Sequence, residues 1–404
     1  MRQRKETVTA LLFLLAMGAA LVWLAFPFLT GDSALRTALG ALRRDPASFP
    51  AFVSEAEGDL NDDLDRAHGF IQLYGGFQRL TGRRVLEDVD QSARVVKLSD
   101  GALNFSYPHA EPLDTAPLAE AVEDLSDALA AEGISLLYAA APQKLQQGRE
   151  AELLPPGIHD YANDNADRLL AALRDHGTDT LDLRPLFDGR SDYEDLFFRT
   201  DHHWKPEAAF LAWQELARVL DADYGISTEP SRTDEGSYDK TVYEDIFLGS
   251  QGKRTGSLYA GVDSITEYVP RFDTDFTYSS ASFQAPRTGP FGTSLLFPER
   301  VAERDWFNGN PYTLYAGGDY ALATIDNGLH PNGKKILLLR ESFSCALTPF
   351  LALSCDQLTT VDLRQFQGDL MATIRDVDPD LVVVLYCVSS LGNSALFSFG
   401  QGTS

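Results

Sequence analysis

The sequence predicts an α/β protein in which a mostly parallel β-sheet lies between two layers of helices. From residue 113 onward, segments with apolar residues at helical spacing alternate with short segments that are apolar throughout. Strands that are apolar at every position are buried on both faces, as in parallel sheets covered by helices. The stretch 221–331 interrupts the alternation, because it is rich in Gly, Ser, Thr, Tyr and Phe and has little helical periodicity. We therefore expect one main domain, 113–404, with a β-rich insertion at 221–331.

Three segments of this domain carry the apolar periodicity of amphipathic helices. The first lies around residues 118–129, where Leu or Val recurs every three or four residues, and Gly133 can end it. The second spans about 160–175, and the third spans about 205–220. We expect these helices to cover the faces of the sheet.

Five short apolar segments predict the strands of the sheet. They are 134–141, 180–183, 335–339, 359–363 and 381–386. Several are rich in β-branched residues, which favours strands over short buried helices. In doubly wound sheets, ligand sites lie beyond the carboxyl ends of the parallel strands. Polar residues that directly follow these segments are therefore candidates for a functional site.

The N-terminal residues predict an uncleaved signal anchor at 1–31, followed by a stalk segment at 32–112. Three basic residues precede the stretch 7–31, which contains no charge, and a bilayer-spanning helix needs about 20 residues. By the positive-inside rule, the N-terminus stays in the cytoplasm and the rest is exported. A cleaved signal peptide is the alternative, but its apolar core would be shorter, about 7–15 residues. We expect a single-pass protein of the cell membrane whose main domain is extracytoplasmic.

The composition excludes several classes of partner. The chain has 404 residues and a net charge of −25, with 59 acidic against 34 basic residues. So strong an acidic excess argues against nucleic acid and against broad docking on anionic lipid. Cys345, Cys355 and Cys387 fit no metal motif and are too few for a disulfide scaffold. We predict that they are buried apolar residues, with one bridge between Cys345 and Cys355 as the alternative, and we expect no metal and no cofactor.

Two short motifs carry the candidate chemistry. Thr-Asp-His-His-Trp at 200–204 lies just before the third helix, and Arg-Glu-Ser-Phe-Ser at 340–344 directly follows a predicted strand. A serine hydroxyl is a weak nucleophile that needs a base, and the base needs a carboxylate at its other nitrogen. Asp201 and His203 are two residues apart, so in an extended segment they point to the same face. We predict that Ser342 Oγ lies about 2.6–3.2 Å from one nitrogen of His203, with Asp201 at the other.

Simpler interpretations of these motifs stay open. Two adjacent histidines with an acid could bind a metal, or Asp201 could cap the following helix, and isolated polar clusters are more often structural than catalytic. His202 competes for the role of the base, and Ser344 competes for the role of the nucleophile. Alternation along an extended chain would point His202 to the opposite face, and two helical steps would turn Ser344 about 200° away from Ser342.

The string Asp-His-His-Trp, followed by Lys-Pro-Glu-Ala-Ala-Phe, resembles the motif of the DHHW family of exported bacterial proteins. That family is similar to the SGNH-hydrolase-like alginate O-acetylation proteins, which carry Asp-x-His-Trp and then Gly-Thr-Ser-Tyr-Ser. In this resemblance, Asp201 and His203 fall on the family's Asp and His, and Ser342 falls on its nucleophile. The sequence departs from the pattern at Arg340 and Glu341, which replace Gly-Thr.

The resemblance implies an SGNH-like three-layer α/β/α domain and a Ser-His-Asp enzyme of acyl transfer. Its expected reaction is the O-acetylation of an exported or cell-wall polysaccharide, with a membrane-bound O-acyltransferase as the partner that supplies acyl groups. A carbohydrate esterase would use the same residues, with water in place of the sugar. A non-enzymatic polysaccharide-binding or assembly protein that keeps the fold is the other alternative.

Further residues are secondary candidates for substrate or oxyanion contacts. Lys144 follows a predicted strand, where the family has a Pro-Lys pattern, and Arg364 closes another strand. Gly249 lies in a turn and could lend an oxyanion-hole amide. An ordinary surface or ion-pair role explains Lys144 and Arg364 at least as well, and glycine in a turn commonly serves backbone freedom. His202 and Ser344 complete this secondary set.

Overall fold

The computed structural model describes residue 18 and residues 68–400. The chain divides after Leu73, and the residues from Tyr74 onward form the compact unit described below. The predicted anchor at 1–31, apart from residue 18, and the predicted stalk up to residue 67 lie outside the described residues. Within the described ranges, no helix is both long and apolar enough to span a membrane.

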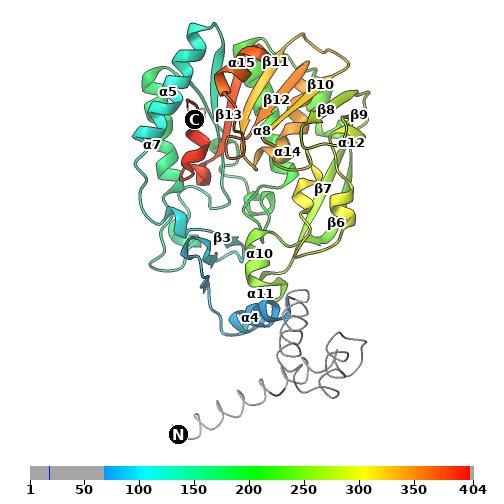
Figure 1. The fold of residues 1–404 in the computed structure, drawn as a ribbon. Coiled ribbons are helices and arrows are strands. Elements are labelled where there is room, and N and C mark those ends of the chain that lie inside the picture. Colours follow the sequence, from blue (N-terminus) through cyan, green and yellow to red (C-terminus); the bar gives the residue numbers. More distant parts are fainter. Residues whose placement is uncertain (1–17, 19–67, 401–404) are drawn as a thin grey trace, which may run out of the picture. The chain divides into compact units, whose positions relative to one another are not determined.

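An eight-stranded sheet with the order β5-β4-β13-β11-β12-β10-β8-β9 forms the centre of this unit (Figure 1). Its first five strands run parallel to one another. They are the five strands predicted from apolar segments, and their bounds lie within two residues of the predicted ones. These strands are β4 (Ser135–Ala141), β5 (Asp179–Asp182), β11 (Lys335–Arg340), β12 (Gln357–Val361) and β13 (Leu381–Cys387).

The insertion contributes the other three strands of this sheet. β10 (Leu322–Asn327) pairs antiparallel with β12, and β8 (Phe276–Ser280) and β9 (Arg287–Gly289) follow toward the edge. The sheet is therefore mixed, whereas the sequence predicted a mostly parallel one. Deeply buried and less buried residues alternate along β8 and β10, so these strands lack the continuous apolar pattern of the parallel half.

The rest of the insertion consists of a hairpin and short helices. β6 (Tyr238–Phe247) and β7 (Asp263–Pro270) pair antiparallel in a separate two-stranded sheet. The segment that joins them contains α10 (Ser250–Thr255) and α11 (Ser257–Ala260). The remaining short helices are α9 (Pro230–Thr233), α12 (Phe291–Ser294) and α13 (Glu299–Ala302).

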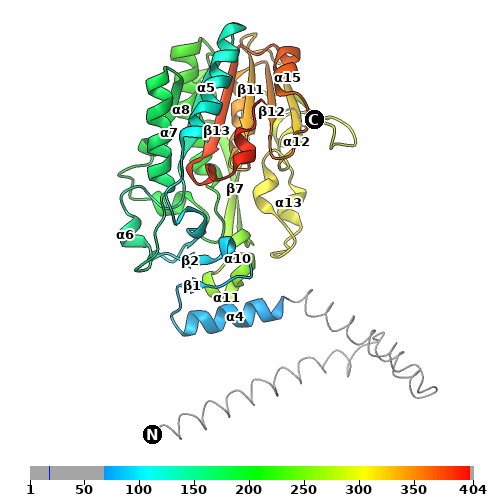
Figure 2. The same ribbon diagram turned by 60° about the vertical axis from the view of Figure 1, so that its left-hand side comes forward.

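Helices cover both faces of the parallel half of the sheet, as Figure 1 and Figure 2 show. On one face lie α5 (Ala116–Ala131), α7 (Ala162–His176) and α15 (Leu370–Val377), and on the other lie α8 (Pro206–Tyr224) and α14 (Ser344–Leu351). Successive residues of β4 alternate between the two cores, because Leu136 packs on the first face and Leu137 on the second. The predicted three-layer α/β/α arrangement is present.

Local signals set the bounds of the helices that flank the site. α7 ends at Gly177, which adopts a left-handed conformation with φ of 97°. α8 begins with Pro206, whose ring suits the first turn of a helix because its missing N–H would have no partner there. The first turn of α8 therefore follows directly after the motif at 200–204.

Residues 74–112, which the sequence assigned to the stalk segment, belong to the compact unit. After helix α4 (Gly69–Leu80) they form a three-stranded sheet of β1 (Val85–Leu86), β2 (Val95–Lys97) and β3 (Leu103–Asn104). A Ser-Asp-Gly turn at 99–101 lies between β2 and β3, and Gly101 has a φ of 93°. Val96 is fully buried and packs in one cluster with Leu153 of α6 (Glu150–Leu153), so this part of the segment is held by apolar packing.

All three cysteines are buried and free. They are therefore buried residues, as predicted, and the alternative bridge between Cys345 and Cys355 is not formed. Cys345 has a polar neighbour, because its Sγ lies 3.3 Å from Oδ1 of Asp319. Burial raises the pKa of the Cys345 thiol, which therefore stays protonated.

Candidate active site

The serine turn, residues 341–343, lies at the carboxyl end of β11. β11 ends at Arg340 and α14 begins at Ser344, so the turn joins a central strand to a buried helix. Glu341 and Phe343 are 2% and 1% exposed, whereas Ser342 between them is only half-buried. The turn therefore presents the Ser342 side chain at the sheet edge where parallel α/β proteins bind ligands.

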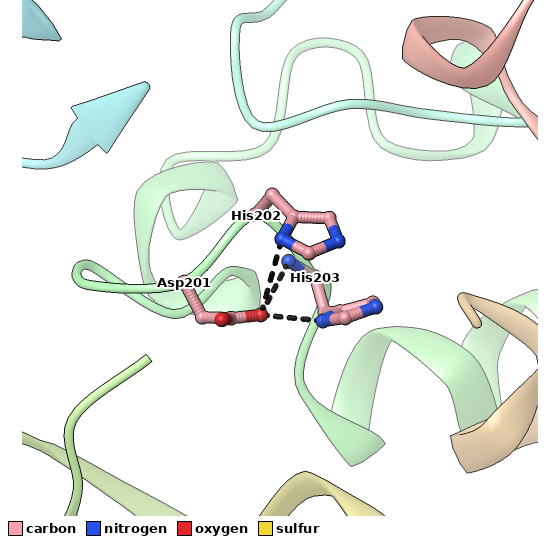
Figure 3. A group of neighbouring side chains, drawn as sticks. All are labelled: Asp201, His202 and His203. Carbon is pink, nitrogen blue, oxygen red and sulfur yellow. Dashed lines mark hydrogen bonds and ion pairs between the residues drawn. The ribbon is translucent and has the colours of Figure 1, made fainter. Parts of the chain in front are cut away.

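The histidine loop, residues 198–203, is tight and precedes α8. An antiparallel bridge joins Phe197 to Trp204, and the N–H of Phe198 donates to the carbonyl of His203 at 3.2 Å. The segment is bent, whereas the sequence argument assumed an extended chain. Oδ1 of Asp201 accepts the main-chain N–H of His203 at 3.1 Å and also bonds to its Nδ1 (Figure 3). The expected contact is thus formed by a side-chain turn of the kind that Asp favours.

The histidine loop and the serine turn meet at His203. Its Nε2 lies 2.8 Å from Oγ of Ser342, and its Nδ1 is bonded to Asp201. The side chains of His203 and Asp201 are only 9% and 5% exposed, so little water competes for the bond between them. The ring of Tyr312 stacks on the imidazole, with centroids 4.0 Å apart and planes 17° apart. Asp201, His203 and Ser342 therefore have the geometry of a Ser-His-Asp triad.

Two residues of the insertion form hydrogen bonds with the histidine loop. At the start of α10, the N–H of Ser250 donates to Oδ2 of Asp201 at 2.6 Å. The buried Asp263 of β7 accepts the main-chain N–H groups of Arg199 and Thr200, each at 2.8 Å. No local pattern in the sequence indicated Asp263, because it is about sixty residues away along the chain. Its carboxylate fixes the backbone that leads into Asp201.

The electrostatics of the loop keep the Asp201 carboxyl ionised. Burial alone would raise its pKa, but the imidazoles of His202 and His203 and the Ser250 N–H hold the pKa of Asp201 well below its usual range. Burial and the neighbouring His203 lower the pKa of His202 to about 3. Nδ1 of His202 lies 3.0 Å from Oγ of Ser250. His202 is therefore neutral near pH 7 and bonds to Ser250, while His203 contacts the serine turn.

One carbonyl group links the histidine loop to the serine turn. The indole N–H of Trp204 and the phenol O–H of Tyr312 both donate to the main-chain carbonyl of Phe343, each at 2.8 Å. Burial raises the pKa of Tyr312 well above its usual value, so the phenol stays a donor. Trp204 of the motif is thus a structural link, and Tyr312, which no sequence pattern indicated, connects the insertion to both segments.

Asp201, His202 and His203 also have the spacing of a metal site, because their ligand atoms lie within 4.8 Å of one another (Figure 3). Hydrogen bonds account for the same geometry. Nδ1 of His203 faces Asp201, and Nδ1 of His202 faces Ser250. An ion held by these atoms would have to displace both contacts, so the donor set fits a triad better than a metal centre.

Two of the secondary candidates are placed where they serve other contacts. Ser344 begins α14, and its Oγ lies 3.5 Å from the carbonyl of Leu385 in β13, so it points toward the sheet. The N–H of Gly249 donates to Oγ1 of Thr200 at 3.0 Å, so this amide does not face an acyl oxygen in this arrangement. A Cβ on Gly249 would lie 2.1 Å from Cβ of Asp201, and this close approach explains the glycine.

Lys144 and Arg364 are held by partners within the protein. Nζ of Lys144 donates to a β3 carbonyl at 2.6 Å and to Oε1 of Gln251 at 3.1 Å, and burial lowers its pKa to about 8. Arg364 forms ion pairs with Asp362 at 2.6 Å and with Asp319 at 3.0 Å. The ion pairs of Arg364 agree with its ordinary interpretation. Lys144 is instead buried and bonded to uncharged groups, and it also lines a cleft beside the histidine loop.

The two residues that depart from the family pattern have different surroundings. Arg340 is 1% exposed and forms a buried ion pair with Asp319, so it lies beneath the site. Glu341 turns toward the serine, and its Oε2 lies 3.1 Å from Oγ of Ser342. The sequence therefore marked Glu341 as unusual without indicating that it contacts the candidate nucleophile.

A cleft of about 590 Å³ opens beside the histidine loop. Among the described residues that line it, there are amide, hydroxyl, aromatic and basic side chains but no carboxylate. They are Asn104, Phe105, Pro108, His109, Gln143, Lys144, His202, Ser250, Gln251, Arg254, Ser389, Ser390, Gly392 and Asn393. In a chain with a net charge of −25, this lining is locally distinct and suits a hydroxyl-rich ligand.

The three-layer architecture and the site at the carboxyl ends of parallel strands define an SGNH hydrolase-like α/β fold. Residues 105–243 match the protein-family model described as "SGNH hydrolase-like domain, acetyltransferase AlgX". The matched region contains the histidine loop and ends before the serine turn. The resemblance predicted from the Asp-His-His-Trp motif is confirmed.

Two curated relatives are similar over part of their length. The chain is 31% identical to the alginate biosynthesis protein AlgX of Pseudomonas aeruginosa over 155 residues, which are 37% of this chain and 31% of that protein. It is 31% identical to the probable alginate O-acetylase AlgJ of Pseudomonas fluorescens over 113 residues, 28% of each. The chain thus spans less than a third of the length of each relative.

Two solved structures share the fold over most of the chain. PatB1 of Bacillus cereus, determined with a sulfonyl adduct, has a TM-score of 0.63 and 21% identity, and the match covers 78% of this chain and 99% of PatB1. A DHHW family protein from Eubacterium siraeum has a TM-score of 0.59 and 18% identity, with coverage of 79% and 99%. At these identities the similarity establishes the fold alone.

Proposed function

We propose that this protein is a Ser-His-Asp acyl-transfer enzyme that O-acetylates an exported or cell-wall polysaccharide. The proposal rests mainly on the 2.8 Å contact between Ser342 Oγ and Nε2 of His203, with Nδ1 held by Asp201. This arrangement supplies a nucleophile, a base and a group that orients the base. A protein that only binds or assembles polysaccharide does not need it, so the contact favours an enzyme.

In the proposed reaction, His203 removes the proton of Ser342 as Oγ attacks the carbonyl carbon of an acyl donor. The tetrahedral intermediate collapses, the bond to the leaving group breaks, and the leaving group takes the proton from His203. His203 then removes the proton of a polysaccharide hydroxyl as its oxygen attacks the acyl-serine. The second collapse releases the O-acylated sugar and returns the proton to Ser342. Asp201 stabilises the imidazolium in both halves.

The substrate class is proposed from the relatives and from the cleft. AlgX and AlgJ are named for alginate biosynthesis and alginate O-acetylation, and the matched family model names an acetyltransferase. The cleft beside the histidine loop offers amides, hydroxyls and an aromatic side chain, which are groups that bind sugars. Both observations support a polysaccharide acceptor, without indicating which polysaccharide it is.

The cellular setting is also a proposal. The charge-free stretch 7–31 and its basic flank support a single membrane anchor with the main domain outside the cytoplasm. An extracytoplasmic transferase needs a source of activated acyl groups, which a membrane-bound O-acyltransferase would provide. N-terminal sequencing of the protein from the membrane fraction tests the anchor. A mature N-terminus near residue 32, on a protein found in the soluble fraction, would contradict it.

Incubation with 4-nitrophenyl acetate, an activated acetyl ester, tests the chemistry. We expect an acetyl adduct in the intact mass, and peptide mapping should place it on Ser342. Ser342→Ala should abolish the adduct, whereas Ser344→Ala is the matched control and should retain it. A wild-type protein that neither forms the adduct nor releases nitrophenol would contradict the proposal and favour a binding protein.

Product analysis with and without an oligosaccharide acceptor separates the two enzymatic alternatives. A transferase forms acetylated sugar when the acceptor is present, because the sugar hydroxyl replaces water at the acyl-serine. An esterase releases acetate at the same rate in both reactions. A rate of acetate release that does not respond to any acceptor would leave the esterase as the better description.

A further inference from the structure

Glu341 has contacts that the Ser-His-Asp arrangement does not require. Its carboxylate is buried, and Oε2 lies 3.1 Å from Oγ of Ser342 and 3.1 Å from the N–H of Phe343. Its other oxygen, Oε1, accepts the N–H of Cys387 at 3.1 Å. Cys387 ends β13, so one side chain joins the serine turn to the carboxyl end of the neighbouring strand.

The hydroxyl of Ser342 has two acceptors and a single proton. Oγ lies 2.8 Å from Nε2 of His203 and 3.1 Å from Oε2 of Glu341. When the hydroxyl donates to His203, it is ready to lose its proton to the base. When it donates to Glu341, Nε2 must itself donate an N–H to Oγ. Because Nδ1 also donates its proton to the Asp201 carboxylate, the ring is then an imidazolium. A carboxylate at this position therefore favours the protonated form of His203.

Glu341 also limits which groups can stabilise an acyl oxygen. The N–H of Phe343 directly follows the serine at the start of a helix, where main-chain amides commonly stabilise an oxyanion. Here this N–H donates to Glu341. A developing negative charge next to the Glu341 carboxylate would also be repelled. The acyl oxygen should therefore point away from Glu341.

Other ionisable groups around His203 come from several segments. Against the effect of burial, the guanidinium groups of Arg340 and Arg364, together with the imidazole of His203, hold the pKa of Asp319 below its usual range. Asp362, Asp319 and Glu341 likewise raise the pKa of Arg364. Tyr312 stacks on the imidazole as a neutral phenol. The groups that face His203 and Glu341 come from five segments. They are Asp201 and His202 from the histidine loop, Tyr312 and Asp319 from the insertion, Arg364 from the segment after β12, Tyr138 from β4, and Tyr386 and Cys387 from β13. Glu341 differs from the other carboxylates in contacting the Ser342 hydroxyl itself.

We propose that Glu341 is a positioning residue that shares the hydroxyl proton of Ser342 with His203 and fixes the serine turn to β13. The inference rests on the proposed function, because it takes Ser342 as the nucleophile. A role confined to structure would affect stability and overall activity. The shared proton adds a specific consequence for the pH dependence of acylation.

Glu341→Gln tests this consequence, because it removes the charge and keeps the shape of the side chain. The kcat/KM for 4-nitrophenyl acetate is measured against pH for wild type and variant. We expect the acidic limb to move to lower pH by on the order of one pH unit, because the lost carboxylate no longer stabilises the imidazolium of His203. We also expect kcat to fall about tenfold or more, with KM little changed.

Asp356→Asn is the matched control. Its carboxylate is also partly enclosed, but it accepts the main-chain N–H groups of Asn332 at 3.0 Å and Gly333 at 2.8 Å at the amino end of β12, opposite the carboxyl ends where the serine turn lies. This variant should leave the acidic limb in place. If wild type forms the acyl-serine but the acidic limb of Glu341→Gln is unshifted, the inference about Glu341 is wrong and the proposed function still stands. A wild type that forms no acyl-serine would overturn the proposed function as well.

Glu341→Asp covers the case in which the amide variant does not fold. It keeps the charge, but a side chain shorter by one methylene cannot reach Ser342 and Cys387 together. The acidic limb should move less than in Glu341→Gln, because the charge stays near His203, while kcat falls about tenfold because the hydroxyl is no longer held. Wild-type kcat in this variant would contradict the positioning role.

Discussion

The histidine loop and the serine turn are held in place by different parts of the molecule. The serine turn is built on the central sheet, because it follows β11 and its Glu341 accepts an N–H from the end of β13. The histidine loop has its anchors in the insertion, where Asp263 and Ser250 bind its backbone and the Asp201 carboxylate. The nucleophile thus depends on the core, and the base depends on a region that extends this core.

This difference indicates that the insertion positions the base of the candidate site. Its strands β8, β9 and β10 continue the central sheet, and its Tyr312 contacts both segments of the site. A substitution in the insertion should therefore disturb the base first, while one in the sheet should disturb folding first. The following predictions test this division, beginning with the largest expected effect.

Removing either partner of the 2.8 Å contact should have the largest effect. Ser342→Ala and His203→Ala should each lower kcat by about 10⁴-fold or more and by similar amounts, because triad members act as a unit. Nitrophenol release from the activated ester, followed in stopped-flow or steady-state assays, measures this. Ser344→Ala is the control, since Ser344 faces β13. Loss of activity in the control, with Ser342→Ala active, would reverse the assignment.

Asp263→Ala should lower both stability and activity. It leaves the buried N–H of Thr200 and the partly buried N–H of Arg199 without their acceptor, which costs about 2–4 kcal/mol in the free energy of unfolding. The displaced loop should lower kcat about 100-fold, because a shift near 1 Å has effects of that size. Urea unfolding and ester turnover measure the two effects. Asp239→Ala, at an exposed position on β6, should change neither, and wild-type kcat in Asp263→Ala would show that the loop does not need the insertion.

Gly249→Ala should lower activity about tenfold. It should lower the free energy of unfolding by about 1–3 kcal/mol, less than Asp263→Ala does. The new methyl group would lie 2.1 Å from Cβ of Asp201, so the carboxylate and His203 must shift. The backbone of Gly249 has a φ of −73°, which other residues adopt, so the effect arises from contact alone. Gly292→Ala is the control, since its methyl group meets nothing closer than 3.6 Å. Equal kinetics in both variants would contradict the tight contact.

His202→Asn should produce the smallest effect, a change in the pH dependence of stability. The folded-state pKa of His202 is about 3, whereas an unfolded histidine titrates near 6.5. Between these values the unfolded chain binds the proton and the folded chain does not, so wild type loses stability as the pH falls below about 6.5. The thermal unfolding midpoint should therefore decrease less between pH 7.5 and pH 5.0 in His202→Asn than in wild type. His159→Asn, which replaces an exposed histidine, is the control, and its midpoint should decrease as much as that of wild type.

The parallel half of the fold could be predicted because its strands β4, β11 and β13 are nearly continuous apolar runs. β11 and β13 illustrate this, since nearly all of their residues are buried. The antiparallel half could not be predicted as part of the same sheet. β8 and β10 have alternating burial, and the pairings of β10 with β8 and with β12 join residues about 30–50 positions apart, so no local pattern indicated their order.

The candidate site was predictable where two local signals coincided. Asp201 and His203 share a short motif, and Ser342 follows a strand that could be recognised. Tyr312 and Asp263 act through contacts between distant segments, and an isolated Tyr or Asp carries no sequence signal of such a contact. The bent loop also shows why the argument from alternation was insufficient, because the Asp201 side chain bonds to its own backbone.

The carbonyl of Phe343 receives hydrogen bonds from both Trp204 and Tyr312, so three distant stretches of chain converge on one oxygen atom. Ser342 lies 139 residues after His203, and the insertion lies between them. In a partly folded chain, Ser342 and His203 are therefore not yet in contact. Contacts between residues far apart in the sequence slow folding. The complete arrangement requires the histidine loop, the insertion and the serine turn to be in place together.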